Sequence, residues 1–161
     1  MKALVLYFTR TGNTKLIAEA VAETLRADVE AFDDGTDYSG VLGFLKGGKD
    51  AFTGRTTDLS PLRHSPDDYD LVVIGQPVWA ARPVPAVNAL AARHPMNGRP
   101  LALFVTYDGM GDLGCLERTA QLFAQARVGA RISFLQVGRD RADSVRRAKE
   151  WARELAGAPR G

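Results

Sequence analysis

Hydroxyl, amide and glycine residues are concentrated in one short stretch near the start of the chain, between an apolar run and a segment with helical spacing of apolar residues. The stretch consists of Thr9, Arg10, Thr11, Gly12, Asn13 and Thr14. Backbone N–H groups at a helix N-terminus bind phosphate because they lack an acceptor within the helix and carry partial positive charge. Gly12 allows close approach of the backbone, and the threonines add hydroxyl donors. The pattern predicts a phosphate-binding loop.

An ordinary helix cap is the alternative, because Asn13 or Thr14 alone could cap the helix. The stretch has one glycine, whereas a dinucleotide-binding fingerprint reads G-x-G-x-x-G, so a pyrophosphate ligand is disfavoured.

The later run Gly43–Asp50 nearly spells G-x-x-x-x-G-K-[ST], but Asp50 stands where a Mg²⁺-binding hydroxyl belongs and no clear strand precedes it. These features argue against nucleotide hydrolysis.

Two later loops could complete a site for a planar ring. Trp79 follows an apolar run that ends at Gly75, and prolines stiffen the chain around it. Tyr107 follows a second apolar run and is succeeded by a glycine-bearing stretch whose backbone can approach a ligand. Trp79 could instead anchor a partner interface or pack its own loop, and the glycines could form a plain turn. Together with the first loop, these residues predict a site for a phosphorylated planar ring.

The elements that must position these loops follow from hydrophobic periodicity. Short apolar runs alternate with segments of helical spacing, which predicts a doubly wound α/β domain with a parallel sheet. The predicted strands are Ala3–Phe8, Asp28–Phe32, Leu71–Gly75, Pro100–Thr106 and Arg131–Val137. The apolar character of all these runs except the second predicts strands that are buried on both faces. The irregular stretch Asp33–Asp70 contains one possible helix around Ser39–Phe52. Ligands of such folds bind beyond the carboxyl ends of the strands.

Length and composition limit the function further. The 161 residues fit a single domain spanning 1–161, and no apolar run is long enough to cross a membrane. Polar residues follow the apolar N-terminus at once, which favours a cytoplasmic protein over a secreted one.

Cys115 is the only cysteine, and neither histidine has a carboxylate at metal-ligand spacing, so no metal site is expected. Residues 126–161 contain nine Lys and Arg but four Asp and Glu. We interpret this basic excess as a solvated helix face, because no nucleic-acid-binding motif accompanies it.

The segments TRTGNT, GQPVWAARPVPAV and VTYDGMG, in this order and at strand ends, resemble the flavodoxin-like FMN-binding proteins. The stretch GVLGFLKGGKDAFTGRTTDLSPL is similar to the segment before the third strand of many bacterial members, and the resemblance covers residues 2–156. It implies a flavodoxin-like three-layer sandwich whose five-stranded parallel sheet has the order 2-1-3-4-5. It also implies noncovalent FMN that cycles through semiquinone and hydroquinone.

The resemblance assigns residues to each end of the cofactor. The FMN phosphate would be held by Thr9, Arg10, Thr11, Gly12, Asn13 and Thr14. The isoalloxazine would be flanked by Pro77, Val78, Trp79 and Ala80, and by Thr106, Tyr107, Asp108, Gly109 and Gly111. The chain departs from many relatives at Gln76, where Thr or Ser is common, and in the slightly basic net charge of +2.

The preferred function is electron transfer through FMN to unidentified redox partner proteins, by a monomer or weak dimer. One alternative is an NAD(P)H-dependent FMN reductase acting on quinones or similar acceptors, and another is a non-catalytic FMN-binding module. A phosphorelay receiver would need acids where Thr9 and Arg10 stand and an Asp at the end of the third strand. A low-molecular-weight phosphatase would need a cysteine after the first strand, and Cys115 is elsewhere.

Overall fold

The computed structural model describes residues 1–33, 35, 43, 45–46, 49 and 58–158. The helix predicted around Ser39–Phe52 lies outside the described residues, apart from isolated positions.

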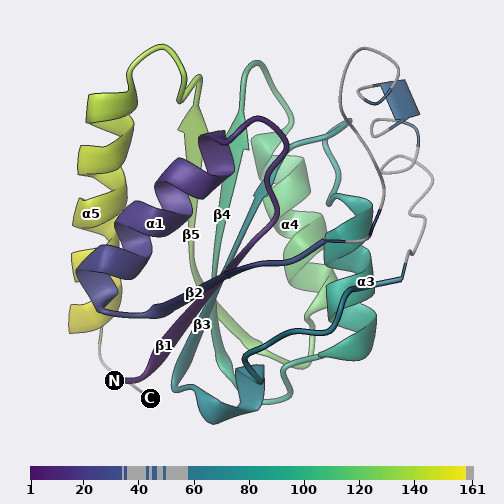
Figure 1. The fold of residues 1–161 in the computed structure, drawn as a ribbon, viewed down its shortest axis with the longest axis vertical. Helices are drawn as coiled ribbons and strands as arrows, with labels where there is room; N and C mark the ends of the chain where they lie inside the picture. The colour runs from purple at the N-terminus through teal and green to yellow at the C-terminus, as the bar shows by residue number, and fades with distance from the viewer. Residues whose placement is uncertain (34, 36–42, 44, 47–48, 50–57, 159–161) are drawn as a thin grey trace.

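A five-stranded parallel sheet forms the centre of the molecule (Figure 1). Its strands are β1 (Ala3–Tyr7), β2 (Asp28–Ala31), β3 (Leu71–Pro77), β4 (Pro100–Tyr107) and β5 (Arg127–Leu135). The strand order is β2-β1-β3-β4-β5, which confirms the predicted order. Val5 of β1 pairs with Val29 on one side and with Val73 on the other.

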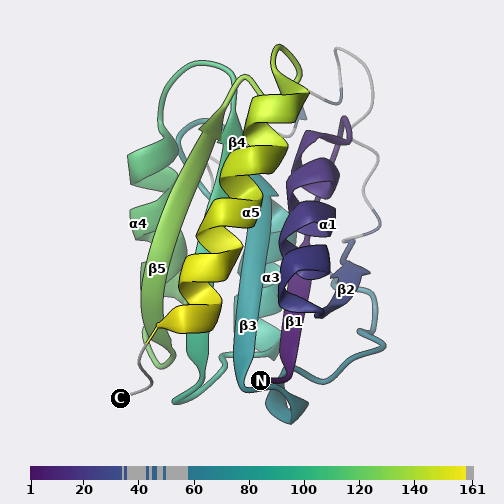
Figure 2. The same cartoon turned by 90° about the vertical axis from the view of Figure 1, so that its left-hand side faces the viewer.

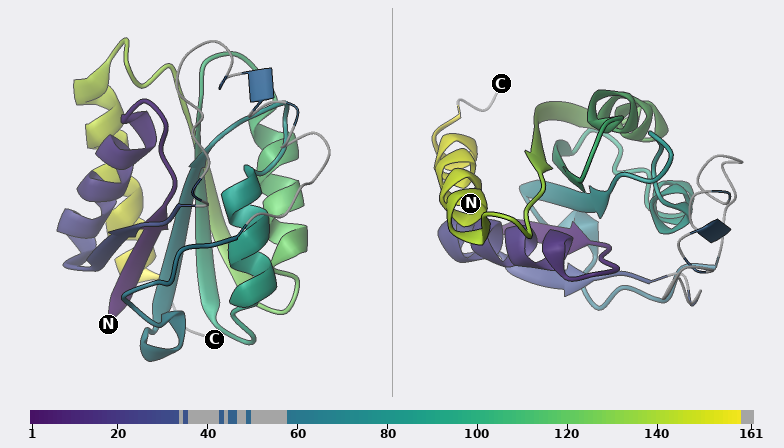
Figure 3. Two further views of the ribbon diagram at one scale, coloured as in Figure 1. Left: turned by 45° about the vertical axis from the view of Figure 1, so that its right-hand side comes forward. Right: turned by 90° about the horizontal axis from the view of Figure 1, so that it is seen from above.

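Helices cover both faces of this sheet and make three layers (Figure 3). Helices α1 (Asn13–Leu25) and α5 (Arg141–Gly157) lie on one face, and α3 (Pro85–Arg93) and α4 (Asp112–Leu122) lie on the other. A short 3₁₀ helix, η1 (Pro66–Asp68), precedes β3. The doubly wound prediction is therefore confirmed. Within the described residues, no helix combines the length and apolar character needed to cross a bilayer.

The core is divided by the sheet into two apolar clusters. Leu4 and Leu6 of β1 point into the cluster shared with α3 and α4, whereas Val5 and Tyr7 point into the cluster shared with α1 and α5. Successive side chains of a strand point to opposite faces, so a strand buried on both faces has to be apolar throughout. This requirement explains the unbroken apolar runs of the inner strands.

Strand β5 differs from the prediction. It was expected to span Arg131–Val137 and to be buried on both faces, but it spans Arg127–Leu135 and most of its residues are exposed or half-buried. This exposure arises because β5 lies at one edge of the sheet, with a neighbouring strand on one side only (Figure 2). Phe134 is its one fully buried residue. The burial prediction for this strand was therefore wrong.

Gly75 shows how closely β3 and β4 approach each other at the centre of the sheet. A Cβ atom at position 75 would lie 2.0 Å from Cζ of Phe104 on the neighbouring strand. The Phe104 ring is fully buried and packs edge-on against Phe134 and Trp151, with ring centroids 6.2 and 6.3 Å apart. The aromatic ring thus fills the volume that a side chain at position 75 would need.

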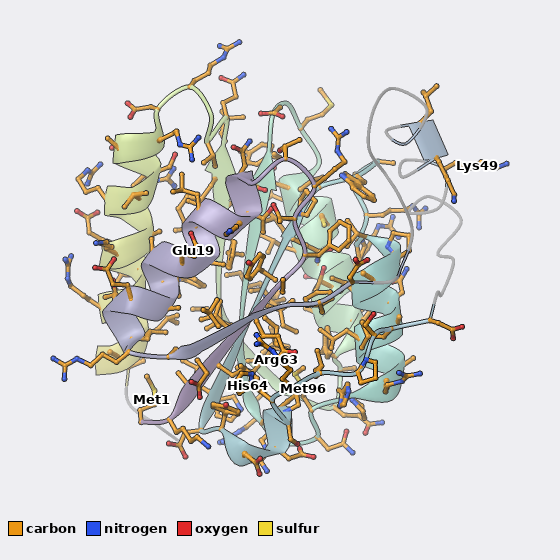
Figure 4. The ribbon with its side chains drawn as sticks, viewed as in Figure 1. Met1, Glu19, Lys49, Arg63, His64 and Met96 are labelled. Atoms are coloured by element: carbon orange, nitrogen blue, oxygen red, sulfur yellow. The ribbon has the colours of Figure 1, made fainter. Side chains whose placement is uncertain are left out.

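The Glu30 carboxylate of edge strand β2 binds the segment of Arg63 and His64, which precedes β3. Its two oxygens accept hydrogen bonds from the backbone N–H of Arg63 at 2.7 Å and of His64 at 3.0 Å. The His64 ring places Nδ1 2.7 Å from the same carboxylate. Arg63 and His64 lie together in the lower half of Figure 4. Burial alone would raise the pKa of Glu30, but these hydrogen bonds outweigh burial and lower it below its usual value.

Glu30→Gln is expected to reduce the free energy of unfolding at neutral pH by about 2 kcal/mol, because a charged acceptor of partly buried hydrogen bonds is lost. A carboxyl whose folded pKa is lowered adds stability above its unfolded pKa of about 4.5, and this stability is lost as the pH falls through the folded pKa. The difference between the two proteins should therefore shrink in acid. Urea unfolding between about pH 3 and pH 7 measures it. Glu23→Gln, at an exposed ion pair with Lys149, is the control, and an equal loss there would contradict the assignment.

Candidate functional site

Three loops meet at the carboxyl ends of β1, β3 and β4 and enclose one cavity of about 290 Å³. Chain connections leave β1 toward one face of the sheet and β3 toward the other (Figure 1), so the cavity lies at the point where the winding reverses. Its walls are formed by Arg10, Thr11, Asn13, Thr14, Pro77, Val78, Trp79, Thr106, Tyr107, Asp108, Gly109, Met110 and Val137.

The first loop turns into α1 through Gly12, whose φ of +92° is in the left-handed region that glycine adopts without strain. The Thr9 hydroxyl accepts hydrogen bonds from the N–H of Gly12 at 3.1 Å and of Lys15 at 3.4 Å. Thr9 therefore holds the loop from inside and does not line the cavity. The alternative in which Asn13 or Thr14 caps the helix with its side chain does not occur.

Hydrogen-bond donors dominate the cavity wall formed by this loop. Among the described residues, the backbone N–H groups of Asn13 and Thr14 donate to no protein atom. They lie at the N-terminus of α1, where the helix dipole favours an anion. Arg10 and Thr11 line the same cavity, and the loop has no carboxylate. This donor set fits a phosphate group, which offers only acceptor oxygens and negative charge at neutral pH.

Gln76 anchors the start of the second loop. Its side chain is 1% exposed, and its Oε1 accepts from the backbone N–H of Val84 at 2.9 Å. Its Nε2 donates to the Thr119 hydroxyl at 2.7 Å, and that hydroxyl donates to the carbonyl of Cys115 at 2.7 Å. Every polar atom of this network is thus paired. The network joins the end of β3 to the start of α3 and to α4, and it fixes both ends of the loop between them.

Residues Trp79 to Arg82 form a tight turn beside the cavity. The N–H of Arg82 donates to the carbonyl of Trp79 at 3.0 Å, and Ala80 and Ala81 both adopt left-handed φ angles of 50° and 56°. This is the type I′ pattern, which favours Asn and Gly. The Trp79 indole is 7% exposed and packs edge-on against Phe8 at 5.5 Å. Most of the indole therefore belongs to the core, and only a small part faces the cavity.

Ala80→Asn is expected to raise the free energy of unfolding by about 0.5–1 kcal/mol, because asparagine tolerates the left-handed conformation that strains alanine. Ala80 is exposed, so the longer side chain has room. Thermal unfolding measures the change. Ala92→Asn, at an exposed position within α3, is the matched control and should destabilise the helix slightly. A loss of stability in both variants would contradict the strain argument.

The third loop is joined to the second by close packing. Gly111 precedes α4 with a φ of +96°, and a Cβ atom there would lie 2.7 Å from Cβ of Ala81. The loop is also tied to the chain after β5, because the N–H of Gln136 donates to the carbonyl of Tyr107 at 2.7 Å. Tyr107 is half-buried and lines the cavity. Of the two aromatic residues in the lining, Tyr107 is more exposed than Trp79.

Most of the predicted site residues converge on the cavity, but four do not line it. Thr9 and Gly12 shape the first loop from behind, and Ala80 and Gly111 lie outside the lining. Two lining residues were missed. Met110 lies within the predicted third loop and is 87% exposed. Val137 follows β5, and applying the rule of carboxyl strand ends to that strand as well would have selected it.

Other chemistry finds little support in the described part of the chain. No group of three or more His, Cys, Asp or Glu side chains could hold a metal ion there. Burial raises the pKa of the Cys115 thiol to about 12, so the thiol is protonated at neutral pH and is a poor nucleophile.

Flavoproteins and flavodoxins are among the solved structures to which the chain is similar. The chain is 21% identical to a flavoprotein from Lactobacillus acidophilus NCFM in complex with FMN, with a TM-score of 0.69 over 82% of this chain and 92% of that one. It is 18% identical to a flavodoxin, WrbA-like protein, from Agrobacterium tumefaciens (TM-score 0.65; 96% and 94% covered). It is 15% identical to oxidised flavodoxin 2 from Bacillus cereus (TM-score 0.63; 97% and 98% covered). No protein-family model and no curated protein sequence matches the chain significantly. The sheet order, the winding and these likenesses together show that the chain has the flavodoxin-like fold.

Proposed function

We propose that the cavity binds FMN and that the protein is a cytoplasmic electron carrier serving a redox partner protein, as a monomer or weak dimer. The observation that carries the proposal is the shared cavity of the first and third loops. One part of its wall consists of hydrogen-bond donors at a helix N-terminus, and another part includes the aromatic residue Tyr107. A phosphorylated planar ring satisfies both parts at once. The FMN complex of the L. acidophilus protein, which has the same fold, supports this choice.

Different residues of the cavity would hold the two ends of FMN. Arg10, Thr11, Asn13 and Thr14 would bind the phosphate, and Tyr107 with the neighbouring backbone would contact the ring. Bound FMN would supply the one- and two-electron redox chemistry, which no side chain of the site provides. The protein would orient the ring and limit the access of water to one face. It would also place the Asp108 carboxylate near a group whose charge changes on reduction.

An NAD(P)H-dependent reductase is the second candidate, and one observation favours it. The Trp79 indole packs against Phe8 in the core, so it covers little of the cavity. Met110, at the cavity, is 87% exposed. A ring bound there would have one face uncovered beside an apolar side chain, and a second planar substrate could approach that face. The likeness to the WrbA-like protein is compatible with this function.

Two measurements test the proposals in sequence. Fluorescence titration of the apoprotein should show FMN binding at least about tenfold more tightly than riboflavin, because charge-assisted hydrogen bonds hold the phosphate. No binding of either flavin would overturn the proposed function. The FMN-loaded protein is then mixed with NADH or NADPH and a quinone. Slow oxidation supports the carrier, whereas rapid multiple turnover would establish the reductase in its place.

A further inference from the structure

Thr14 and Thr106 connect the start of α1 to the end of β4 through their hydroxyl groups. Their Oγ1 atoms are 2.8 Å apart, although the residues are 92 positions apart in the sequence. Thr14 belongs to the first turn of α1 and Thr106 to the end of β4. The two residues are 2% and 5% exposed, and both line the cavity. The resemblance described above placed Thr106 beside the ring, but this contact joins it to the loop with the phosphate-binding features.

A count of hydrogens shows what this pair can offer a ligand. Each hydroxyl carries one hydrogen, and the contact between them uses one of the two. Neither hydroxyl makes another hydrogen bond among the described residues. One hydrogen of the pair is therefore free for a ligand or water in the cavity. Which residue provides it depends on the direction of the Thr14–Thr106 bond.

An anion bound at the start of α1 would favour one of the two directions of the Thr14–Thr106 hydrogen bond. The free N–H groups of Asn13 and Thr14 mark where the anion would bind. If Thr106 donates to Thr14, the Thr14 hydroxyl donates its own hydrogen at the same place. The opposite direction leaves the free hydrogen on Thr106, which belongs to β4 and not to the helix N-terminus. A chain of hydrogen bonds also polarises its members, so the donor strength of Thr14 increases when Thr106 donates to it.

We infer that Thr106 is a positioning residue for the ligand's phosphate, acting through Thr14 and not through the ring. The inference rests on the proposed FMN site and assigns a specificity role within it. Thr106 distinguishes phosphorylated from unphosphorylated flavin without touching the phosphate. It orients the Thr14 hydroxyl and strengthens it as a donor.

The test compares FMN and riboflavin binding by the folded apoprotein. Thr106→Val removes the donor at nearly constant volume and should raise the FMN Kd about 5- to 10-fold, the size of one ordinary hydrogen bond. The riboflavin Kd should change less than about twofold. Thr106→Ser keeps the hydroxyl and should bind FMN as the unaltered protein does. Thr24→Val is the control, because the Thr24 hydroxyl donates to Ala20 within α1, away from the cavity.

A double-mutant cycle tests the route through Thr14. In a protein that already carries Thr14→Val, Thr106→Val should cause no further loss of FMN affinity. Additive losses would overturn the inference, and so would equal losses for FMN and riboflavin, which would place Thr106 at the ribityl or ring portion. Thr106→Ala replaces Thr106→Val if circular dichroism shows the valine variant unfolded. If the unaltered protein binds neither flavin, the proposed function fails first and this inference fails with it.

Discussion

The double substitution Thr11→Val and Thr14→Val is expected to weaken FMN binding by about 100-fold or more, since each hydroxyl bonded to a charged group contributes about 1.5–3 kcal/mol. Both residues line the cavity beside the N-terminus of α1. Valine matches threonine in shape, so the change removes donors without opening a void. Riboflavin lacks the phosphate, and its affinity should fall only a few-fold. Fluorescence titration of both flavins gives the two dissociation constants.

The ratio of the two affinities identifies the cause of the loss. A general disturbance of the cavity would weaken both flavins alike, and that result would refute the phosphate assignment of the first loop. Thr24→Val on the same helix should leave both affinities unchanged, because its hydroxyl bonds to the helix backbone. The Thr14 change also leaves the buried Thr106 hydroxyl without its partner. A modest loss of stability, of about 1 kcal/mol, is therefore expected in the apoprotein.

Gly75→Ala is expected to lower the free energy of unfolding by about 3 kcal/mol, at the upper end of the range for overpacked cores. The new methyl group would meet the Phe104 ring at 2.0 Å. The ring is enclosed by Phe134 and Trp151 and cannot move aside without disturbing the cluster on that face. Urea unfolding followed by circular dichroism measures the loss.

Two control variants make this prediction specific. Gly109→Ala should cost far less, because nothing lies within 4 Å of a Cβ at position 109. Phe104→Leu removes the ring tip and should reduce the cost of Gly75→Ala when the two changes are combined. Equal costs with and without the Phe104 ring would show that backbone freedom, and not the aromatic contact, requires glycine there.

The sequence was informative wherever the determining interactions are local. Unbroken apolar runs and helical stripes are sufficient to predict the winding, and the rule of carboxyl strand ends selects the three loops of the cavity. The exposure of β5 depends on its place at the sheet edge, which no pattern within residues 127–135 reveals. The burial of Trp79 depends on Phe8, a partner about 70 positions away in the sequence. Long-range packing of this kind requires coordinates.

The buried Gln76 network has a consequence for the history and engineering of the chain. The side chain at position 76 bonds to the backbone N–H of Val84, which immediately precedes α3, and to the hydroxyl of Thr119 in α4. A shorter residue there would leave the buried backbone N–H of Val84 without an acceptor, whereas the Thr119 hydroxyl would keep its hydrogen bond to the Cys115 carbonyl. Position 76 can therefore change only where another acceptor reaches the Val84 N–H, so a segment containing position 76 that is transplanted from another protein has to supply that acceptor.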